Sequence, residues 1–226
     1  MKIAVVTCTG GRPELFALCR RWVEKQTVKP DLWIVGTDTG DRNLDLPPWA
    51  THQDFKSGNV DDALSNALSL VPPDHAAIVM EDDDYYGPQH IEKCMERLLA
   101  GADVTTGEVA MRWHLPAKRW APPHFPQPLI QGTIGIRPEK VQLYRSIINK
   151  WDYAKENKLF KEVRYPGWTT VGIKGVGYGL PGRAGYTNSH NPEHYKVKKL
   201  PKDHGLKNFR SYLGADAEAY IQLLKP

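Results

Sequence analysis

"AAIVMEDDDYYGP", residues 76–88, joins an apolar run directly to four consecutive carboxylates, Glu81 to Asp84. The apolar half has the length and composition of a buried strand. Like charges this close raise one another's pKa unless a cation or hydrogen-bond donors neutralise them. We therefore expect a strand whose end carries the acidic residues to a cation-binding site. The alternative is a solvated acidic turn.

Strand-like and helix-like segments alternate around this stretch. Short apolar runs typical of buried strands lie at 2–6, 31–36, 75–80 and 102–111. Segments with helical spacing of apolar residues lie at 14–26, 59–71 and 88–101. Such alternation within about a hundred residues predicts an α/β fold, with a mainly parallel sheet and helices on both faces.

Three polar loops follow the predicted strands, at 7–13, 36–41 and 81–88. In open α/β sheets the ligand binds outside the carboxyl ends of the strands. The three loops are therefore expected to meet at one edge of the sheet, and the acidic run lies in one of them.

The second half of the chain, 111–226, has a different composition. Residues 113–130 are rich in proline and aromatic residues, which predicts an ordered but irregular loop. A strand, a turn and a helix are expected over 132–151, a glycine-rich loop over 171–190, and an amphipathic helix over 214–225. We interpret 1–226 as a single domain.

Composition narrows the class of protein. The chain has 226 residues, 41% of them hydrophobic, which is enough for a proper core. No apolar run approaches the length of a membrane span, and the N-terminus lacks a signal-peptide core. Three cysteines without metal-site spacing suit a reducing compartment. We expect a soluble cytoplasmic protein, with neither a membrane nor a protein partner predicted.

Four motifs in order give the first 110 residues a resemblance to the GT-A nucleotide-sugar glycosyltransferases, in particular family 2. "VVTCTGGRPELF" matches the opening strand, loop and helix, and "WIVGTDTG" matches the strand that ends in a base-contacting aspartate. "SGNVDDALSNAL" matches the next helix. "VMEDDDYYGPQHIEKCMERLLAGADVTTG" matches the Asp-x-Asp signature and the proline-started helix after it.

The resemblance implies a donor site. Residues 1–110 would bind the nucleotide-sugar and 111–226 the acceptor. A divalent cation, Mn²⁺ or Mg²⁺, would be held by the acidic run. The implied nucleotide-binding residues are Thr7, Arg12, Asp38, Asp82 and Asp83.

The register of the metal motif has two readings. Asp82 and Asp84 form one Asp-x-Asp, which we prefer, and Glu81 with Asp83 forms a shifted version. The glycine-rich loop that ends at His190 resembles the loop in which GT-A enzymes often carry a further metal ligand. The predicted metal ligands are therefore Asp82, Asp84 and His190.

The implied reaction moves a hexosyl or pentosyl group from a nucleotide-sugar to an acceptor hydroxyl. A hard cation stabilises the charge that develops on the leaving diphosphate. If the reaction inverts the anomeric centre, a carboxylate must accept the acceptor's proton, and Glu156 or Asp152 is the candidate. A retaining reaction needs no such base, and the sequence leaves both open.

Aromatic and basic residues supply the candidates for contacts with the acceptor. Trp113 and Trp120 lie in the proline-rich stretch, where they either stack on a ligand or pin the loop. Lys118 and Arg183 are candidate acceptor contacts, and seven Lys/Arg occur between Arg183 and Arg210. A solvated basic tail is the alternative. Our hypothesis is a DNA acceptor, as in small phage-type enzymes that glycosylate hydroxymethylated pyrimidines after flipping the base.

Three other functions remain open. The first is a glycosyltransferase that acts on a glycan. The second is a sugar-nucleotide nucleotidyltransferase, which normally has a longer glycine-rich first loop with a lysine; "TCTGGRP" lacks it. The third is a non-catalytic module that binds sugar or nucleic acid. Pyrophosphate release would identify the second, and metal-dependent nucleotide binding without turnover would identify the third.

Overall fold

The computed structural model describes most of the chain. The described residues are 1–10, 12–37, 44–56, 60–121, 134–148, 160–174 and 198–224.

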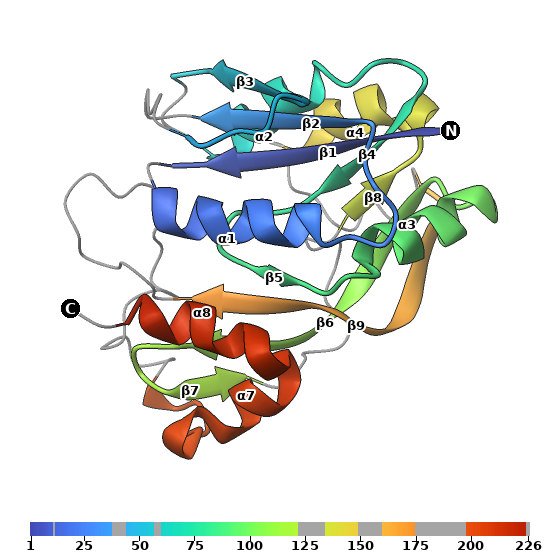
Figure 1. Cartoon of the computed structure of the whole chain (residues 1–226). Helices are drawn as coiled ribbons and strands as arrows, with labels where there is room; N and C mark the ends of the chain where they lie inside the picture. The colour runs from blue at the N-terminus through green and yellow to red at the C-terminus, as the bar shows by residue number, and fades with distance from the viewer. Residues whose placement is uncertain are drawn as a thin grey trace.

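One mixed sheet holds the described part together (Figure 1). Its strand order is β3-β2-β1-β4-β8-β6-β9-β5, and β7 pairs with β6 off this path. The strands are β1 (Lys2–Thr9), β2 (Leu32–Thr37), β3 (Ala50–Asp54), β4 (His75–Val79), β5 (Tyr85–Tyr86), β6 (Val104–His114), β7 (Arg119–Ala121), β8 (Ile134–Ile136) and β9 (Glu162–Lys174).

The sheet has a parallel half and a mixed half. Strands β3, β2, β1 and β4 are all parallel, and of these the sequence predicts β1, β2 and β4. Beyond β4, strand β8 runs antiparallel to both β4 and β6, whereas β9 is parallel to β6. Helical crossovers join β1 to β2 and β3 to β4, and each returns the chain to the same end of the sheet, so the strands that it joins are parallel.

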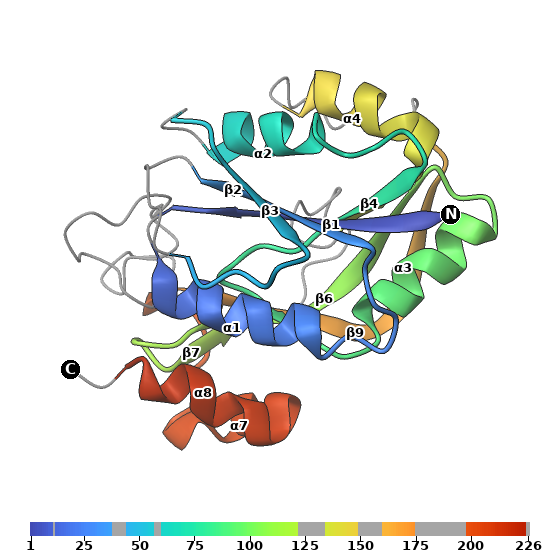
Figure 2. The same cartoon turned by 45° about the horizontal axis from the view of Figure 1, so that its top comes forward.

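Helices cover both faces of the sheet, which confirms the predicted fold class. Figure 2 shows α2 and α4 on one face, with α1 and α3 on the other. Successive residues of β1 point to opposite faces: Ile3 and Val5 join one core cluster, and Ala4 and Val6 join the other. The helices are α1 (Pro13–Glu24), α2 (Val60–Leu68), α3 (His90–Leu99), α4 (Val141–Ile147), α7 (Lys207–Leu213) and α8 (Ala217–Gln222).

Local sequence signals explain where the helices begin and end. Proline at 13 starts α1, because it lacks the N–H that the first turn leaves unpaired. The apolar stripe of α1 buries Leu15, Cys19 and Trp22 as predicted. Past the end of α3, Gly101 adopts a φ of +98°, a conformation that glycine accommodates without a Cβ clash.

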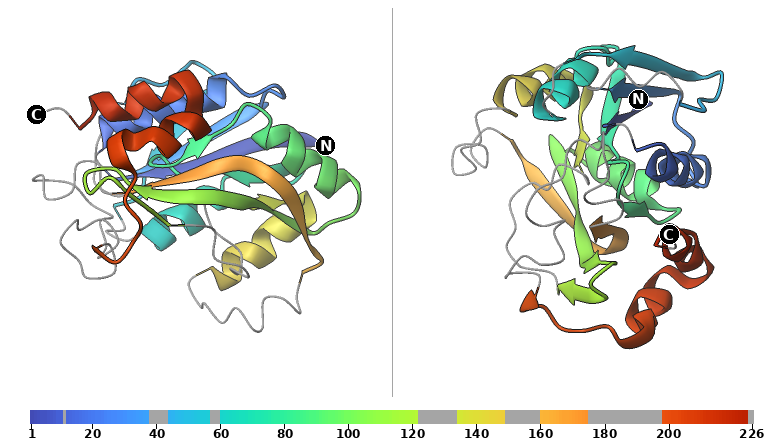
Figure 3. Two further views of the ribbon diagram at one scale, coloured as in Figure 1. Left: turned by 90° about the horizontal axis from the view of Figure 1, so that it is seen from below. Right: turned by 90° about the vertical axis from the view of Figure 1, so that its left-hand side faces the viewer.

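The second half contains more strand than the sequence suggests. Residues 113–121 were expected to be an irregular loop, but they end β6 and form β7. Figure 3 shows β6 and β9 side by side, and residue 174 at the end of β9 pairs with His114. The pairing of β6 with β9 outweighs the weak local β-propensity of these residues, because the two strands are far apart in the sequence but hydrogen-bond to each other. Most of the proline-rich and glycine-rich stretches lie outside the described residues.

The C-terminal segment is anchored to the rest of the molecule by two indole hydrogen bonds. Trp22 donates its indole N–H to the Tyr220 hydroxyl at 2.8 Å. Trp113 donates its own to Asp203 at 3.0 Å. The larger core cluster also contains residues from both halves of the chain. Among the described residues, no helix combines the length and apolar character needed to cross a bilayer.

Candidate donor and metal site

The acidic run lies at the carboxyl edge of the parallel strands. β1 ends at Thr9 and β4 at Val79, and the arrowheads of β1, β2 and β9 point to the same side in Figure 1. Met80 still pairs with β1, since its N–H donates to the Val6 carbonyl at 3.0 Å. The hydrogen bonds of the sheet therefore continue up to Met80, and they fix the position of Glu81, the first residue of the acidic run.

Asp82 is fully buried and bound by the last residue of β1 and by the loop that follows it. Its Oδ2 accepts hydrogen bonds from the Thr9 hydroxyl at 2.6 Å and from Arg12 Nε at 3.1 Å. A second guanidinium nitrogen of Arg12, Nη2, contacts Oδ1. This two-point fork matches the planar guanidinium to the carboxylate. Asp82 thereby joins the loops that follow β1 and β4.

The carboxylates of Glu81, Asp83 and Asp84 converge on one point. One carboxylate oxygen from each of Glu81, Asp83 and Asp84 lies within 4.8 Å of the others. Asp84 Oδ1 accepts the backbone N–H of Ile173 in β9 at 2.9 Å. Asp83 Oδ2 lies 3.4 Å from Arg12 Nη1. The cluster is thus held on one side by β9 and on the other by Arg12.

This arrangement favours the shifted register over the one that we prefer from sequence, and the role of Asp82 as a metal ligand stays a prediction. Asp82 is ion-paired with Arg12 and is not among the three carboxylates whose oxygens converge. The shifted pair, Glu81 with Asp83, faces that point together with Asp84. Three carboxylates are hard oxygen donors of the kind that Mg²⁺ and Mn²⁺ prefer, so the cluster fits a divalent cation.

The charge state of Asp82 reflects its burial. Burial raises the pKa of the Asp82 carboxyl to about 6, although the Arg12 guanidinium opposes that shift. The carboxylate is therefore ionised at neutral pH and forms a buried ion pair with Arg12. Such pairs contribute modestly when intact but are costly to break by removing one partner.

A second layer of buried groups supports the acidic run. The Glu81 backbone N–H donates to the Tyr86 hydroxyl at 2.6 Å, and the Tyr86 ring packs against His90. Burial raises the pKa of Tyr86 well above its usual value, which keeps the hydroxyl neutral. His90 Nδ1 lies 3.3 Å from the Thr170 hydroxyl of β9. Tyr86 and His90 thus tie the run to α3 and β9.

Acid is expected to destabilise the protein through His90. Burial lowers the pKa of His90 from 6.5 to about 3. The unfolded chain therefore binds an extra proton between these values, and stability falls as the pH drops through 6.5. This group alone accounts for a loss of about 2 kcal/mol between pH 7.5 and pH 5.

Urea denaturation of the wild type and of His90→Gln at the two pH values measures this contribution. The variant should lose less stability on acidification, by about that amount. Equal losses in the two proteins would show that His90 is not held neutral.

Two of the predicted nucleotide-binding residues lie in the interior instead. The Thr7 hydroxyl is fully buried and accepts the Trp33 indole N–H at 3.0 Å, and its contact with a nucleotide stays a prediction. Arg12 is also buried, and its guanidinium contacts Asp82 and Asp83; it orients the acidic run from within.

Several predicted site residues lie outside the part of the chain that the structure describes, and their roles stay predictions. They are Asp38, Asp152, Glu156, Arg183 and His190.

The predicted acceptor-side aromatics are also placed differently. Trp113 is fully buried in β6, packed against Trp120 and Phe209, so it has no face for a ligand. Its role as an acceptor contact stays a prediction. Trp120 is partly buried beside it and Lys118 is exposed, and for both the predicted role is untested.

Sequence reasoning missed Thr9 and Tyr86. Thr9 stands three residues before Arg12, so its spacing to Arg12 was visible in "TGGR". The role of Tyr86 depends on the pairing of β5 with β9, which has no local signal.

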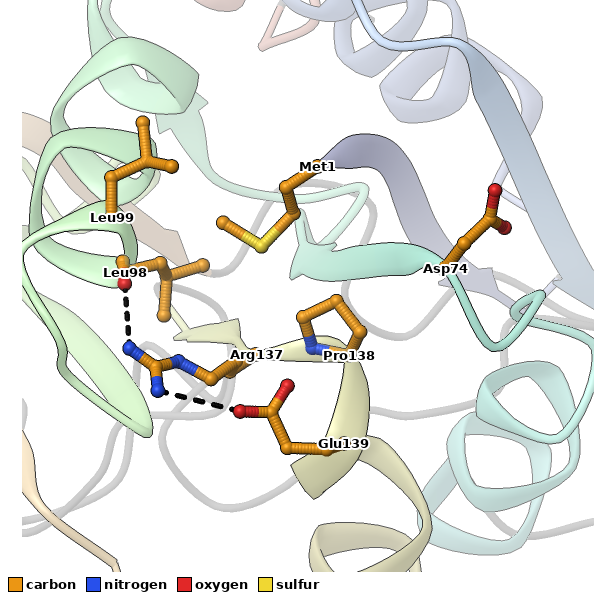
Figure 4. A pocket seen from close by; sticks show the side chains of 7 residues that line it. All are labelled: Met1, Asp74, Leu98, Leu99, Arg137, Pro138 and Glu139. Carbon is orange, nitrogen blue, oxygen red and sulfur yellow. Dashed lines mark hydrogen bonds and ion pairs between the residues drawn. The ribbon is translucent and has the colours of Figure 1, made fainter.

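A separate pocket of about 380 Å³ lies at the opposite edge of the sheet (Figure 4). Met1 and Asp74, which precede β1 and β4, line it together with the end of α3. There Arg137 donates to the Leu98 carbonyl and contacts Glu139. The amino ends of β1 and β4 form this edge, so the pocket is distinct from the acidic cluster.

Comparison with known proteins adds a likeness in fold. No protein-family model and no curated protein sequence matches the chain. Residues 1–349 of S. aureus TarS, a glycosyltransferase with a GT-A-like fold, superpose with a TM-score of 0.58 at 12% identity, covering 76% of this chain. The chain shares the TarS fold.

The likeness to TarS covers only part of that protein. The chain spans 60% of the length of the TarS fragment. The same fragment in complex with UDP superposes with a TM-score of 0.57. The bifunctional IspDF of Campylobacter jejuni superposes with a TM-score of 0.50 at 8% identity, over 74% of this chain and 50% of its own. At these identities the likeness shows the fold.

Proposed function

We propose that the protein is a divalent-cation-dependent glycosyltransferase that uses a nucleotide-sugar donor. The observation that supports this most directly is the convergence of Glu81, Asp83 and Asp84 within 4.8 Å at the carboxyl edge of a TarS-like sheet. TarS itself binds UDP. A nucleoside diphosphate is thus the ligand to test first.

The described residues have separate roles in this proposal. Glu81, Asp83 and Asp84 would hold Mn²⁺ or Mg²⁺. Bound there, the cation would stabilise negative charge on the departing diphosphate. Arg12 and Asp82 act as positioning residues, because their ion pair sets the direction in which the neighbouring carboxylates point. Asp84 joins the cluster to β9 through Ile173.

The other parts of the reaction are proposals on residues outside the described part. Asp38 would contact the base, Arg183 the acceptor side, and His190 would add a metal ligand. An inverting reaction would use Glu156 or Asp152 as the base. The acceptor we propose is the hydroxyl of a hydroxymethylated base in DNA, supported by the basic residues of the C-terminal segment.

A nucleotidyltransferase is the second candidate, because IspDF shares the fold. The loop after β1 argues against it. "TCTGGRP" has no lysine to grip a triphosphate, and its one arginine is ion-paired with Asp82. Release of pyrophosphate from a nucleoside triphosphate and a sugar phosphate would identify this activity.

Thermal unfolding with UDP and other nucleoside diphosphates, with and without Mn²⁺, tests the donor site. At a hundred times Kd the ligand stabilises the folded state by about 2.7 kcal/mol, which raises Tm by roughly 5–10 °C. We expect this shift only when Mn²⁺ is present. It should disappear in Asp83→Asn and Glu81→Gln.

Glu139→Gln at the opposite edge is the matched control and should keep the full shift. A shift of the same size without metal, or in the acidic variants, would count against the metal site. No shift with any nucleotide would leave the acidic run as a charged turn.

A further inference from the structure

Strand β3 is the outermost strand at one end of the described sheet (Figure 1). It pairs with β2 in an unbroken register, from Ala50 opposite Trp33 to Asp54 opposite Thr37. Its five residues are an ordinary strand length, so the outer side of β3 presents a full row of backbone groups. By contrast, the strand at the other end of the sheet, β5, has only two residues. A free edge of ordinary length is able to accept a further strand.

The devices that usually protect a sheet edge are absent from β3. Residues 50–54 contain no lysine, arginine or proline, and their pairing with β2 has no bulge. The one carboxylate, that of Asp54, is turned back onto its own sheet: its Oδ1 accepts the Lys56 N–H at 3.2 Å and the Thr37 hydroxyl at 3.4 Å. The strand therefore lacks the charges that keep other strands away.

The hydrogen bonds to β2 show which backbone groups of β3 face outward. Phe55 donates its N–H to the Thr37 carbonyl of β2 at 2.8 Å. Because successive residues of a strand direct their N–H and C=O groups to alternate sides, those of Ala50, His52 and Asp54 point away from β2. In the described part of the chain, no strand lies on that side for them to pair with.

These three residues are arranged symmetrically about His52. The Ala50 N–H already donates to the Pro47 carbonyl at 3.0 Å, so the Ala50 carbonyl is the group that remains on the outer side. A second copy of the strand, antiparallel and centred on the same residue, would set His52 opposite His52, and the two would exchange both N–H···O bonds. On either side, the Asp54 N–H of one copy would meet the Ala50 carbonyl of the other. The strand is thus complementary to itself.

The side chains are compatible with this register. Thr51 of one copy would lie opposite Gln53 of the other in a non-hydrogen-bonded pair, the closest kind of cross-strand neighbour. Both side chains are exposed, polar and uncharged. Asp54 would lie opposite Ala50, so no like charges would meet. Trp49, directly before the strand, is 38% exposed and adds apolar surface next to this edge.

We propose that two copies of this chain pair through β3 in antiparallel, which joins their sheets across a two-fold axis at His52. Such an interface uses the same patch on both copies and closes after two. A strand from another protein would need its own matching register, whereas a second copy has it by symmetry. Antiparallel pairing reverses the second sheet, so the two acidic clusters would lie at opposite edges of the joined sheet. The proposal is independent of the proposed transferase function, because it uses the backbone of β3.

Sedimentation equilibrium measures the association. One short strand from each copy buries less surface than a standard interface, so we expect a Kd on the order of 10–100 µM. Hydrogen exchange locates the contact. Exchange of the outward amides at 52 and 54 should slow as the protein concentration rises, whereas the amides at 51 and 53 already face β2.

Charged residues at the two exposed positions test the register. Thr51→Lys/Gln53→Lys places lysine opposite lysine on both sides of the axis, and should raise Kd about tenfold. Thr51→Lys/Gln53→Glu changes the same positions but places lysine opposite glutamate, and should associate at least as tightly as the wild type. The two variants differ only at residue 53, so thermal unfolding of both shows whether they are equally well folded.

Leu99→Lys is the control at the opposite edge of the sheet, where Leu99 is 70% exposed beside the pocket of Figure 4. It should leave Kd unchanged. A wild-type protein that stays monomeric at about 1 mM would overturn the proposal. So would equal association of the two residue-53 variants, or a dimer that is lost in Leu99→Lys and kept in Thr51→Lys/Gln53→Lys.

Discussion

Replacing Arg12 with methionine is expected to lower the free energy of unfolding by about 3–5 kcal/mol. Asp82 is fully buried, and Arg12 is its charged partner in a two-point contact. Methionine keeps much of the side-chain volume but leaves the buried carboxyl without its charged partner, so Asp82 either stays ionised in the interior or takes up a proton, and both are costly. For a chain of this size the loss corresponds to a fall in Tm on the order of 10 °C.

Paired variants separate this effect from simple loss of packing. Arg12→Met/Asp82→Leu removes both charges and should recover most of the stability, because no unpaired charge remains. Arg20→Met breaks pairs with Glu24 and Asp45 that are far more exposed, and should cost less than about 1 kcal/mol. Urea and thermal unfolding at pH 7.5 measure all three. If Arg12→Met costs no more than Arg20→Met, the buried ion pair does not exist as described.

The same replacement should also weaken metal binding. Arg12 contacts Asp83 as well as Asp82, so it helps to set the position of a proposed ligand. The Mn²⁺-dependent shift in Tm with nucleotide should shrink in Arg12→Met. It should return in Arg12→Lys only in part, because lysine lacks the planar fork.

Removing the carboxylate of Asp203 is expected to destabilise the C-terminal segment by about 3–4 kcal/mol. Its two oxygens accept the Trp113 indole N–H and the backbone N–H groups of Asn208 and Phe209, in the first turn of α7. In Asp203→Ala three donors lose their acceptor, and at least the indole is buried. Buried donors without partners are costly.

Chemical denaturation and hydrogen exchange over 198–224 measure this effect together. Asp203→Asn keeps one acceptor oxygen and should lose less, about 1–2 kcal/mol. Asp216→Ala is the control, because that carboxylate pairs with Arg21 and Lys25, both well exposed to solvent. Exchange in α7 and α8 that stays as slow in Asp203→Ala as in the wild type would contradict this role.

Much of the first half could be predicted because its signals are local. The apolar run before Glu81, the proline that starts α1 and the glycine after α3 each act within a few residues of their own position. Where such signals agree over successive segments, they predict strands and helices in the right order. The edge strand β3 was missed because its alternation of exposed and half-buried residues is weakly apolar.

The sequence by itself determined the α/β class, the parallel order of the first strands and the place of an acidic site at their carboxyl ends. Periodicity, capping residues and the crossover rule are sufficient for these. Only the tertiary structure decided which carboxylates act together. Asp82 turns inward because Arg12 and Thr9, about seventy residues away, neutralise it, while Glu81, Asp83 and Asp84 face a shared point.

The same division holds for the second half of the chain. The sequence shows two tryptophans and a run of lysines, but their roles depend on strand pairing across more than eighty residues. β6 pairs with β7, and β7 pairs with the segment around Lys202, in an arrangement that buries Trp113. Register between distant strands has no local code, because it is set by the packing of the whole sheet.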